Sequence, residues 1–225
     1  MVDDTLLNLE RRREPYCYVT WIAPYLSGER QCMLYLHYKI NYYTPKRESD
    51  LGAWVEEHAR MVKQIAQEHS EYGGTITVER ENYFAVKSRA VPNLMLGGQC
   101  DVVIGEDNGN TGDGLVVDAK TGQKRPKDRI QVMLYMSLLP AVNKIAHITK
   151  TPYGELVYKD SGSESIEPSA ITVEFKEEVR KLLQAACNNK PVPTPSVSEC
   201  RYCDLQRVCP HFIEASTEAT EIDWL

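Results

Sequence analysis

The stretch Val116-Val117-Asp118-Ala119-Lys120-Thr121-Gly122 decides how the rest of the sequence is interpreted. Its apolar residues predict a buried strand that ends at an acid, with a lysine two positions further on. Because residues i and i+2 of a strand point to the same face, we expect Asp118 and Lys120 to project together. Such a pair can share a divalent cation and a water molecule, since the acid binds the metal while the lysine orients the water or stabilises negative charge.

A second acid, Asp101, follows the run Leu94-Met95-Leu96-Gly97-Gly98-Gln99-Cys100 and precedes Val102-Val103-Ile104. This pattern predicts a strand region over Leu94–Ile104 with the carboxylate inside it. A buried carboxylate without a partner is costly, and a metal ion shared with Asp118 would relieve that cost. Magnesium or manganese suits such a site, because hard cations prefer carboxylate oxygens.

The other elements follow from the spacing of apolar residues. Gln131 and Tyr135 are four residues apart on a helix that Asp128 is expected to cap, so they share one face. Further helices are expected over 31–42, 51–69 and 175–187, and strands over 75–80, 83–87, 115–120 and as a pair around 146–158. The apolar stripe of the 51–69 helix consists of Leu51, Trp54, Val55, His58, Met61, Val62 and Ile65, and Gly73-Gly74 ends the helix. This order predicts an α/β fold with a mixed sheet and no Gly-rich phosphate loop.

Composition and charge narrow the class of protein. The chain has 225 residues, of which 42% are hydrophobic and 26% charged, which excludes a disordered chain and suffices for one sizeable core. A net charge of −6 excludes a protein that coats nucleic acid by bulk charge, but not one with a local basic groove. The charged N-terminus and the absence of a long apolar run predict a cytoplasmic protein. Basic residues concentrate in one segment, at Lys124, Arg125, Lys127 and Arg129.

Three of the seven cysteines lie close together near the C-terminus, in Cys200-Arg201-Tyr202-Cys203 and at Cys209. Without a signal peptide a disulfide framework is not expected, and thiolates at this spacing predict a metal site. Zinc needs four ligands and a cubane iron–sulfur cluster needs four thiolates, so a further ligand must come from elsewhere. Cys32 is the first candidate and Cys17 the second, while His211 could instead complete a Cys3His zinc site.

Together these residues resemble the RecB-like branch of the PD-(D/E)XK nuclease superfamily. The resemblance lies in an acid after a Gly-containing strand, here Gly98 and Asp101, and in a D-x-K-T-G strand end over 118–122. It extends to a Q-x-x-x-Y helix, here Gln131 to Tyr135. It implies a restriction-endonuclease-like fold, with a central mixed sheet flanked by helices, and metal-dependent hydrolysis of DNA.

The same family carries a glycine on an early helix, followed four residues later by His or Glu. Here Gly52 is followed by Glu56, and His58, two residues further on, is the alternative ligand, although its place on the apolar stripe suits a core histidine. By this resemblance the ligands of magnesium or manganese are Glu56, Asp101, Asp118 and the backbone carbonyl of Ala119. Lys120 would position the water, and Gln131 and Tyr135 would hold phosphate or metal-bound water. The DNA backbone would be followed by Lys124, Arg125, Lys127 and Arg129, for which a solvated loop is the alternative.

The cysteines resemble those of the cluster-bearing RecB-like nucleases, which include the CRISPR-associated exonucleases. This implies a [4Fe–4S] cluster on Cys32, Cys200, Cys203 and Cys209. The implied domains are a flexible terminus over 1–14, a clasp formed by 15–45 and 189–213, a nuclease core over 46–188 and an acidic tail over 214–225. The implied function is a single-stranded DNA exonuclease in CRISPR adaptation or in recombination and repair, with adaptation proteins and a second copy of the chain as candidate partners. Two alternatives stay open: a nucleic-acid-binding subunit of a CRISPR adaptation complex with weak or secondary cleavage, and a zinc-stabilised scaffold.

Overall fold

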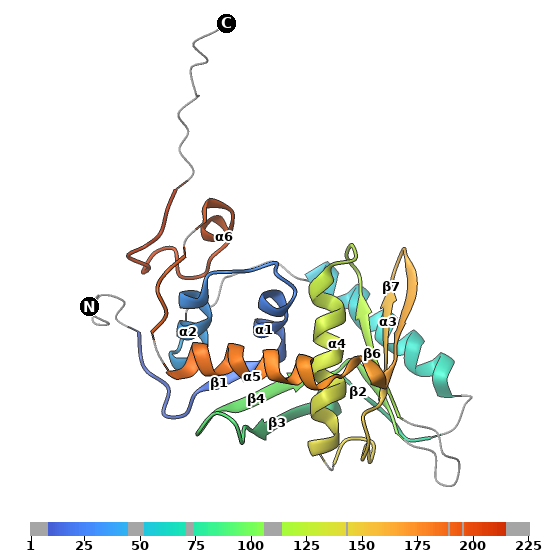
Figure 1. The fold of residues 1–225 in the computed structure, drawn as a ribbon. Helices are drawn as coiled ribbons and strands as arrows, with labels where there is room; N and C mark the ends of the chain where they lie inside the picture. The colour runs from blue at the N-terminus through green and yellow to red at the C-terminus, as the bar shows by residue number, and fades with distance from the viewer. Residues whose placement is uncertain are drawn as a thin grey trace, which may run out of the picture.

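The computed structural model describes residues 9–44, 52–70, 74–105, 114–142, 144–188, 190–194 and 196–214. Its strands form two β-sheets on which the helices pack (Figure 1). Most of the terminus over 1–14, the tail after residue 214, and the predicted helix limits Leu51 and Gly73 lie outside the described residues. Within the described ranges, no helix combines the length and the apolar character needed to cross a membrane.

The strand predicted over 115–120 is confirmed as β6 (Leu115–Lys120), the middle strand of a five-stranded sheet. The order is β2-β5-β6-β7-β8, with β2 (Ile76–Val78), β5 (Val102–Ile104), β7 (Tyr153–Tyr158) and β8 (Gly162–Ile166). β6 runs antiparallel to β5 and parallel to β7, so the sheet is mixed, as predicted. A central strand covered on both faces explains the almost continuous apolar run before Asp118.

A second sheet has the order β1-β4-β3, with β1 (Tyr16–Tyr18), β4 (Met95–Gln99) and β3 (Tyr83–Lys87). The prediction of a single strand region over Leu94–Ile104 is wrong, because the chain leaves β4 and enters β5 of the other sheet after two residues. Asp101 lies in this connection and not inside a strand. The change of sheet therefore brings its carboxylate to the junction between the two sheets.

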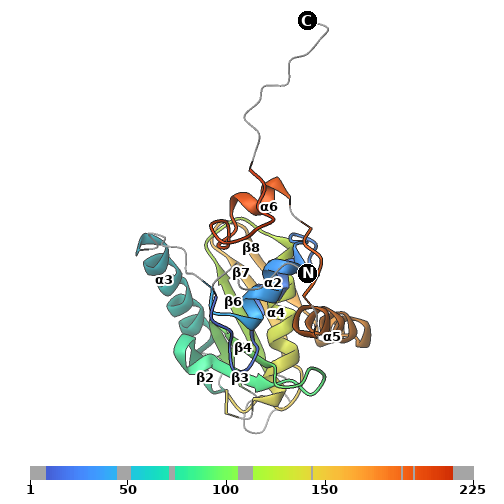
Figure 2. The ribbon, with the colours of Figure 1, turned by 90° about the vertical axis from the view of Figure 1, so that its left-hand side faces the viewer.

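Helices cover both faces of the five-stranded sheet. α3 (Gly52–His69) lies on one side of it and α4 (Pro126–Leu138) on the other (Figures 1 and 2). Successive side chains of β6 divide between the two helices, since Val117 packs in the cluster that contains α3 residues and Val116 in the cluster that contains α4 residues. Asp118 is two residues from Val116 and therefore faces α4.

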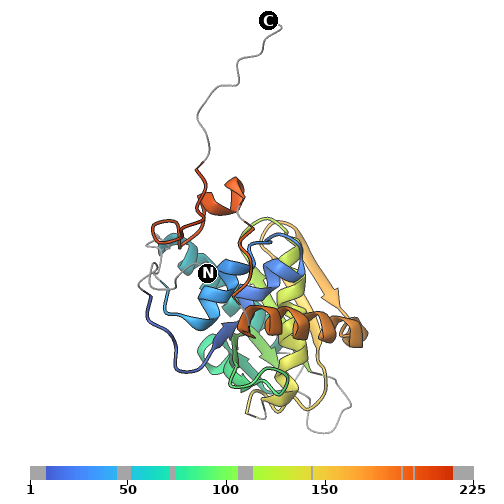
Figure 3. The same ribbon diagram turned by 60° about the vertical axis from the view of Figure 1, so that its left-hand side comes forward.

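Three more helices cover one face of the β1-β4-β3 sheet (Figure 3). α2 (Met33–Asn41) and α5 (Val173–Asn188) confirm the predicted helices over 31–42 and 175–187. α1 (Val19–Leu26) was not predicted, because Pro24 breaks the pattern of the sequence there. Pro24 is the sixth of the eight residues of α1, so it removes the backbone donor that would otherwise bond to the Thr20 carbonyl. The short helix α6 (Val197–Arg201) carries the first cysteine of the C-terminal group.

Only part of the predicted apolar stripe on α3 is buried. Val62 and Ile65 pack against the sheet, whereas 49% of Trp54 and 51% of Val55 is exposed. The first turns of α3 flank the end of β6 and not its apolar middle, so no described part of the sheet covers the stripe there. Sequence spacing shows which residues share a helix face but not where that face leaves the sheet.

Two local predictions are also corrected. α4 begins at Pro126, which suits the first position of a helix, and Asp128 caps the helix from its third position and not as the residue before it. The Asp128 carboxylate accepts a hydrogen bond from the Arg125 backbone N–H at 3.0 Å. The strand pair predicted around 146–158 lies further along the chain, as the antiparallel strands β7 and β8, and Ala146 sits in a turn with a φ of 46°.

Gly98 of β4 leaves room for two buried rings, and its replacement should destabilise the fold. A Cβ at this position would lie 2.7 Å from the Phe84 ring and 2.8 Å from the Tyr135 ring. We expect Gly98→Ala to lower the free energy of unfolding by about 1–3 kcal/mol through overpacking, measured by urea denaturation. Gly122→Ala is the matched control, because a Cβ there meets nothing within 4 Å. Equal stability of the two variants would contradict this explanation.

Candidate active site

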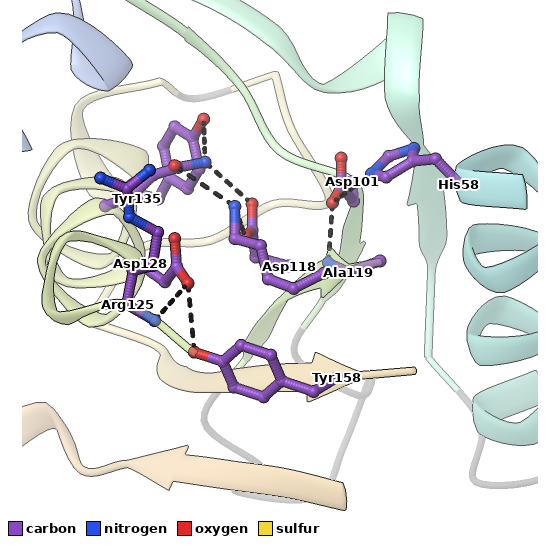
Figure 4. A network of polar contacts seen from close by, with 10 residues as sticks. His58, Asp101, Asp118, Ala119, Arg125, Asp128, Tyr135 and Tyr158 are labelled. Carbon is purple, nitrogen blue, oxygen red and sulfur yellow. Dashed lines mark hydrogen bonds and ion pairs between the residues drawn. The ribbon is translucent and has the colours of Figure 1, made fainter. Parts of the chain in front are cut away.

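β6 ends in two charged side chains on the face that α4 covers (Figure 4). Lys120 Nζ lies 2.6 Å from Asp118 Oδ2. Asp118 is only 2% exposed, and apart from this ammonium its Oδ2 has no partner among the described residues. A buried carboxylate oxygen with an unused lone pair fits a divalent cation, because burial without a partner is costly.

Asp101 approaches the same strand end from the junction between the two sheets. Its Oδ2 accepts a hydrogen bond from the backbone N–H of Ala119 at 2.8 Å and lies 3.2 Å from His58 Nε2. Asp101, Ala119 and His58 line one open cleft of about 1090 Å³ together with Asp118 and Lys120. The charge of Asp101 helps to raise the pKa of Asp118, so the two carboxylates are close enough to interact. The sequence-based expectation that they converge therefore agrees with the geometry.

α4 supplies an amide that joins the two charged groups. Gln131 Nε2 donates to Asp118 Oδ1 at 3.0 Å, and Gln131 Oε1 accepts from Lys120 Nζ at 3.4 Å. Gln131 Nε2 also lies 3.3 Å from Tyr135 Oη, so these residues do share a helix face. Tyr135 is buried with its ring edge-on to Phe84. The phenol thus holds the amide in position, and the amide orients Asp118 and Lys120.

The structure brings His58, and not Glu56, to the carboxylates. Glu56 is exposed and does not line the cleft, whereas His58 is half-buried beside Asp101, whose hydrogen bond raises the pKa of the imidazole. Helix geometry explains the difference, because His58 precedes the buried Val62 by four residues and shares its face. Trp54, one turn earlier, stacks on His58 with 5.2 Å between ring centroids and lines the cleft. The apolar stripe predicted that Trp54 packs in the core. Its position four residues before His58 could instead have indicated that the two side chains lie together at the site.

The four basic residues divide between two hollows. Arg125 and Lys127 line the cleft with the carboxylates, and Lys124 and Arg129 line an adjoining pocket that Arg125 also lines. Arg125 and Arg129 each pair with a glutamate of another segment. Burial, with the neighbouring Arg125, lowers the pKa of Lys127. Arg125 and Lys127 are therefore the two basic residues that face the site, and the charge of Arg125 is already balanced by Glu29.

The cysteine group lies outside this cleft. Among the described residues, no set of three or more His, Cys, Asp or Glu side chains is arranged to hold a metal ion. Cys17, the second candidate for the fourth ligand, is fully buried in the main core. One small cavity is nevertheless lined by Cys32, Cys200, Cys203, Cys209 and His211.

Hydrogen bonds fasten the two distant segments around this cavity. The Glu199 carboxylate of α6 accepts from the backbone N–H groups of Gln31 at 2.9 Å and Cys32 at 3.1 Å. The Tyr35 hydroxyl of α2 donates to Asp204 at 3.0 Å. The segments that carry the cysteines thus contact one another, although they are more than 160 residues apart in the sequence.

A comparison with protein families gives this geometry a context. The model of the PD-(D/E)XK nuclease superfamily matches residues 27–210. The chain belongs to the PD-(D/E)XK nuclease superfamily. Nucleases of this superfamily hydrolyse phosphodiester bonds of nucleic acids with magnesium or manganese. A search of curated proteins finds no match to the chain.

Metal binding at the cleft should depend on the protonation of Asp118. Burial, opposed by Lys120 and reinforced by Asp101, raises the pKa of Asp118 to about 6. Below that pH the carboxyl holds a proton that a cation must displace, so the affinity for Mn²⁺ should fall at least about tenfold per pH unit as the pH drops below about 6. Calorimetric titration without DNA between about pH 5 and 8 measures this. An affinity that does not change over this range would contradict it.

Proposed function

We propose that the chain is a divalent-metal-dependent deoxyribonuclease that acts on single-stranded DNA, most directly as an exonuclease. The observation that carries the proposal is the convergence of Asp101, Asp118 and Lys120 in one cleft, from two separate segments of the chain. The buried Asp118 Oδ2, with a lone pair left over, is the atom best suited to a cation. We assign the helix-borne ligand to His58 in place of Glu56, because only His58 reaches Asp101.

The residues of the cleft have distinct roles in this proposal. A bound magnesium or manganese ion would supply an acidified water and charge neutralisation at the phosphate. Burial lowers the pKa of Lys120, but Asp118 and the other carboxylates outweigh it and raise the pKa overall. Lys120 is therefore an ammonium, suited to stabilising negative charge on the phosphate and not to removing a proton. Gln131 fixes the orientation of Asp118 and Lys120 through its hydrogen bonds to both. Arg125 and Lys127 line the cleft, where they are positioned to contact the DNA backbone.

We also propose a [4Fe–4S] cluster on the four cysteines of the cavity. Three observations support it: the four thiols share one cavity, Leu205 N–H donates to Cys203 Sγ at 3.4 Å, and the family match runs from before Cys32 to just after Cys209. Backbone N–H donation to sulfur is one of the interactions that tune cluster thiolates. Zinc on three cysteines and His211 is the second candidate, because His211 lines the same cavity.

The pathway stays a prediction from the family resemblance. It comprises a role in CRISPR adaptation or in recombination and repair, with adaptation proteins or a second copy of the chain as partners. The alternative is a nucleic-acid-binding subunit with secondary cleavage. The rate at which the chain digests DNA distinguishes the two, because a binding subunit would digest DNA slowly. An intact set of carboxylates and ammonium at the cleft favours the nuclease.

Substitutions at the cleft test the nuclease directly. We expect Asp118→Asn and Lys120→Ala to reduce the digestion of end-labelled single-stranded DNA with Mn²⁺ by about 100-fold or more, because each removes charge from the reacting centre. His58→Ala should cause a comparable loss, and Glu56→Ala, two residues away on the same helix, should retain near wild-type activity. Wild-type digestion by Asp118→Asn would exclude the site. Loss in Glu56→Ala but not in His58→Ala would reverse the ligand assignment.

Metal analysis of anaerobically purified protein tests the cluster. We expect a brown protein with broad visible absorbance and about four iron atoms per chain. Cys203→Ser and Cys32→Ser should lose iron and colour, and Cys187→Ser, whose thiol does not line the cavity, should keep both. A colourless protein with one zinc per chain would instead support the Cys3His site, which His211→Ala would then disrupt.

A further inference from the structure

The β1-β4-β3 sheet has one face that no described helix or strand covers. α1, α2 and α5 lie on the opposite face (Figure 1). The side chains that point toward the helices, such as Cys17, Phe84 and Leu96, are buried. Because strand side chains alternate, the open face consists of Tyr16 and Tyr18 of β1, Met95, Gly97 and Gln99 of β4, and Tyr83, Ala85 and Lys87 of β3.

Three tyrosines on this face are held in one connected group. The Tyr16 ring lies across Gly97, since a Cβ on Gly97 would be 1.8 Å from Tyr16 Oη. Tyr16 Oη is 2.8 Å from Tyr83 Oη, and the rings of Tyr16 and Tyr18 are 4.8 Å apart. Tyr18 is 37% exposed and Tyr83 is 42% exposed. The rings are thus fixed by the sheet while a large part of their surface remains open to solvent.

This aromatic face leads into the candidate active site. A hollow of about 520 Å³ beside it is lined by Tyr18, Tyr83 and Gln99, together with Thr20 and Tyr135. Thr20, Gln99 and Tyr135 also line the cleft that contains the carboxylates. A polymer lying on the sheet can therefore continue into the cleft.

The other end of the face is mixed in charge. A hollow there is lined by two tyrosines, a methionine, three consecutive arginines and two glutamates. These residues are Glu10, Arg11, Arg12, Arg13, Glu14, Tyr16, Tyr43 and Met95. The Arg12 guanidinium lies over the Tyr43 ring, 4.4 Å from its centroid. With only a small excess of positive charge, aromatic surface and not charge dominates the chemistry of this face. Aromatic rings and stacked guanidinium groups recognise the flat faces of nucleic-acid bases.

We propose that this sheet face is a stacking platform that binds single-stranded nucleic acid and guides it into the cleft. The inference rests on the proposed nuclease function and names the surface that would bind its substrate. Base faces are hidden in a duplex, so a platform built of rings selects single strands without reading sequence. Tyr18 and Tyr83 are the rings on which bases stack, and Tyr16 fixes the two in place.

Binding without cleavage tests the platform. Fluorescence anisotropy of a labelled oligothymidylate, with the full chain in EDTA, should show about 5- to 100-fold weaker binding by Tyr83→Ala and by Tyr18→Ala. Tyr83→Phe keeps the ring and loses only the hydroxyl contact with Tyr16, so its affinity should stay within about twofold of wild type. Tyr153→Ala is the matched control, because Tyr153 is also 37% exposed but lies on β7, outside this face.

A spectroscopic signal separates stacking from a merely structural effect. A 2-aminopurine base in the oligonucleotide should be quenched by the wild-type chain and by Tyr83→Phe, but not by Tyr83→Ala or Tyr18→Ala at saturation. Wild-type binding and quenching by both alanine variants would overturn the proposal. The proposal would also be overturned if the two alanine variants lost affinity for a DNA duplex by the same factor as for the single strand. The platform would then not select single strands. Failure of the nuclease proposal is distinguishable, because it appears as continued cleavage by Asp118→Asn whatever the binding data show.

Discussion

A buried ion pair at the end of β6 is the constraint on which the site depends. Placing Asp118 and Lys120 out of water costs free energy that their mutual attraction offsets only when further hydrogen bonds satisfy both groups. Gln131 provides these bonds, Tyr135 holds Gln131, and the Tyr135 ring needs the space that Gly98 leaves. The chemistry at the strand end is therefore connected through four contacts to the packing of the second sheet.

The path of the chain between the two sheets joins the proposed stacking face to the candidate active site. Within five residues, Gly97 accommodates the Tyr16 ring, Gln99 lines both hollows, and Asp101 reaches the backbone of Ala119. A single continuous strand in one sheet would direct these side chains along one surface. The break after β4 instead places the open aromatic face and the carboxylate on either side of a shared edge, so a bound strand can meet both.

Local sequence patterns were enough for some of this architecture and not for the rest. The apolar run of β6 and the period-two rule gave the shared face of Asp118 and Lys120, and helical spacing gave that of Gln131 and Tyr135. An apolar run cannot reveal that its two halves pair with different partners, so the change of sheet at Asp101 was missed. The same limit applies along α3, where burial depends on how far the helix extends past the sheet. The catalytic and metal-binding roles stay predictions, because a pattern of residues does not measure chemistry.

The cysteine clasp and the aromatic face share the N-terminal segment. β1 has three residues and, among the described strands, pairs with β4 alone as the edge strand of its sheet, so its own hydrogen bonds hold it weakly. α2 packs near β1, and the contacts of Glu199 and Asp204 fasten the start of α2 to the C-terminal segment. These contacts therefore restrain the position of β1, and with it Tyr16 and Tyr18. The proposed cluster would then act mechanically, by holding the proposed stacking face beside a cleft that none of the four cysteines lines.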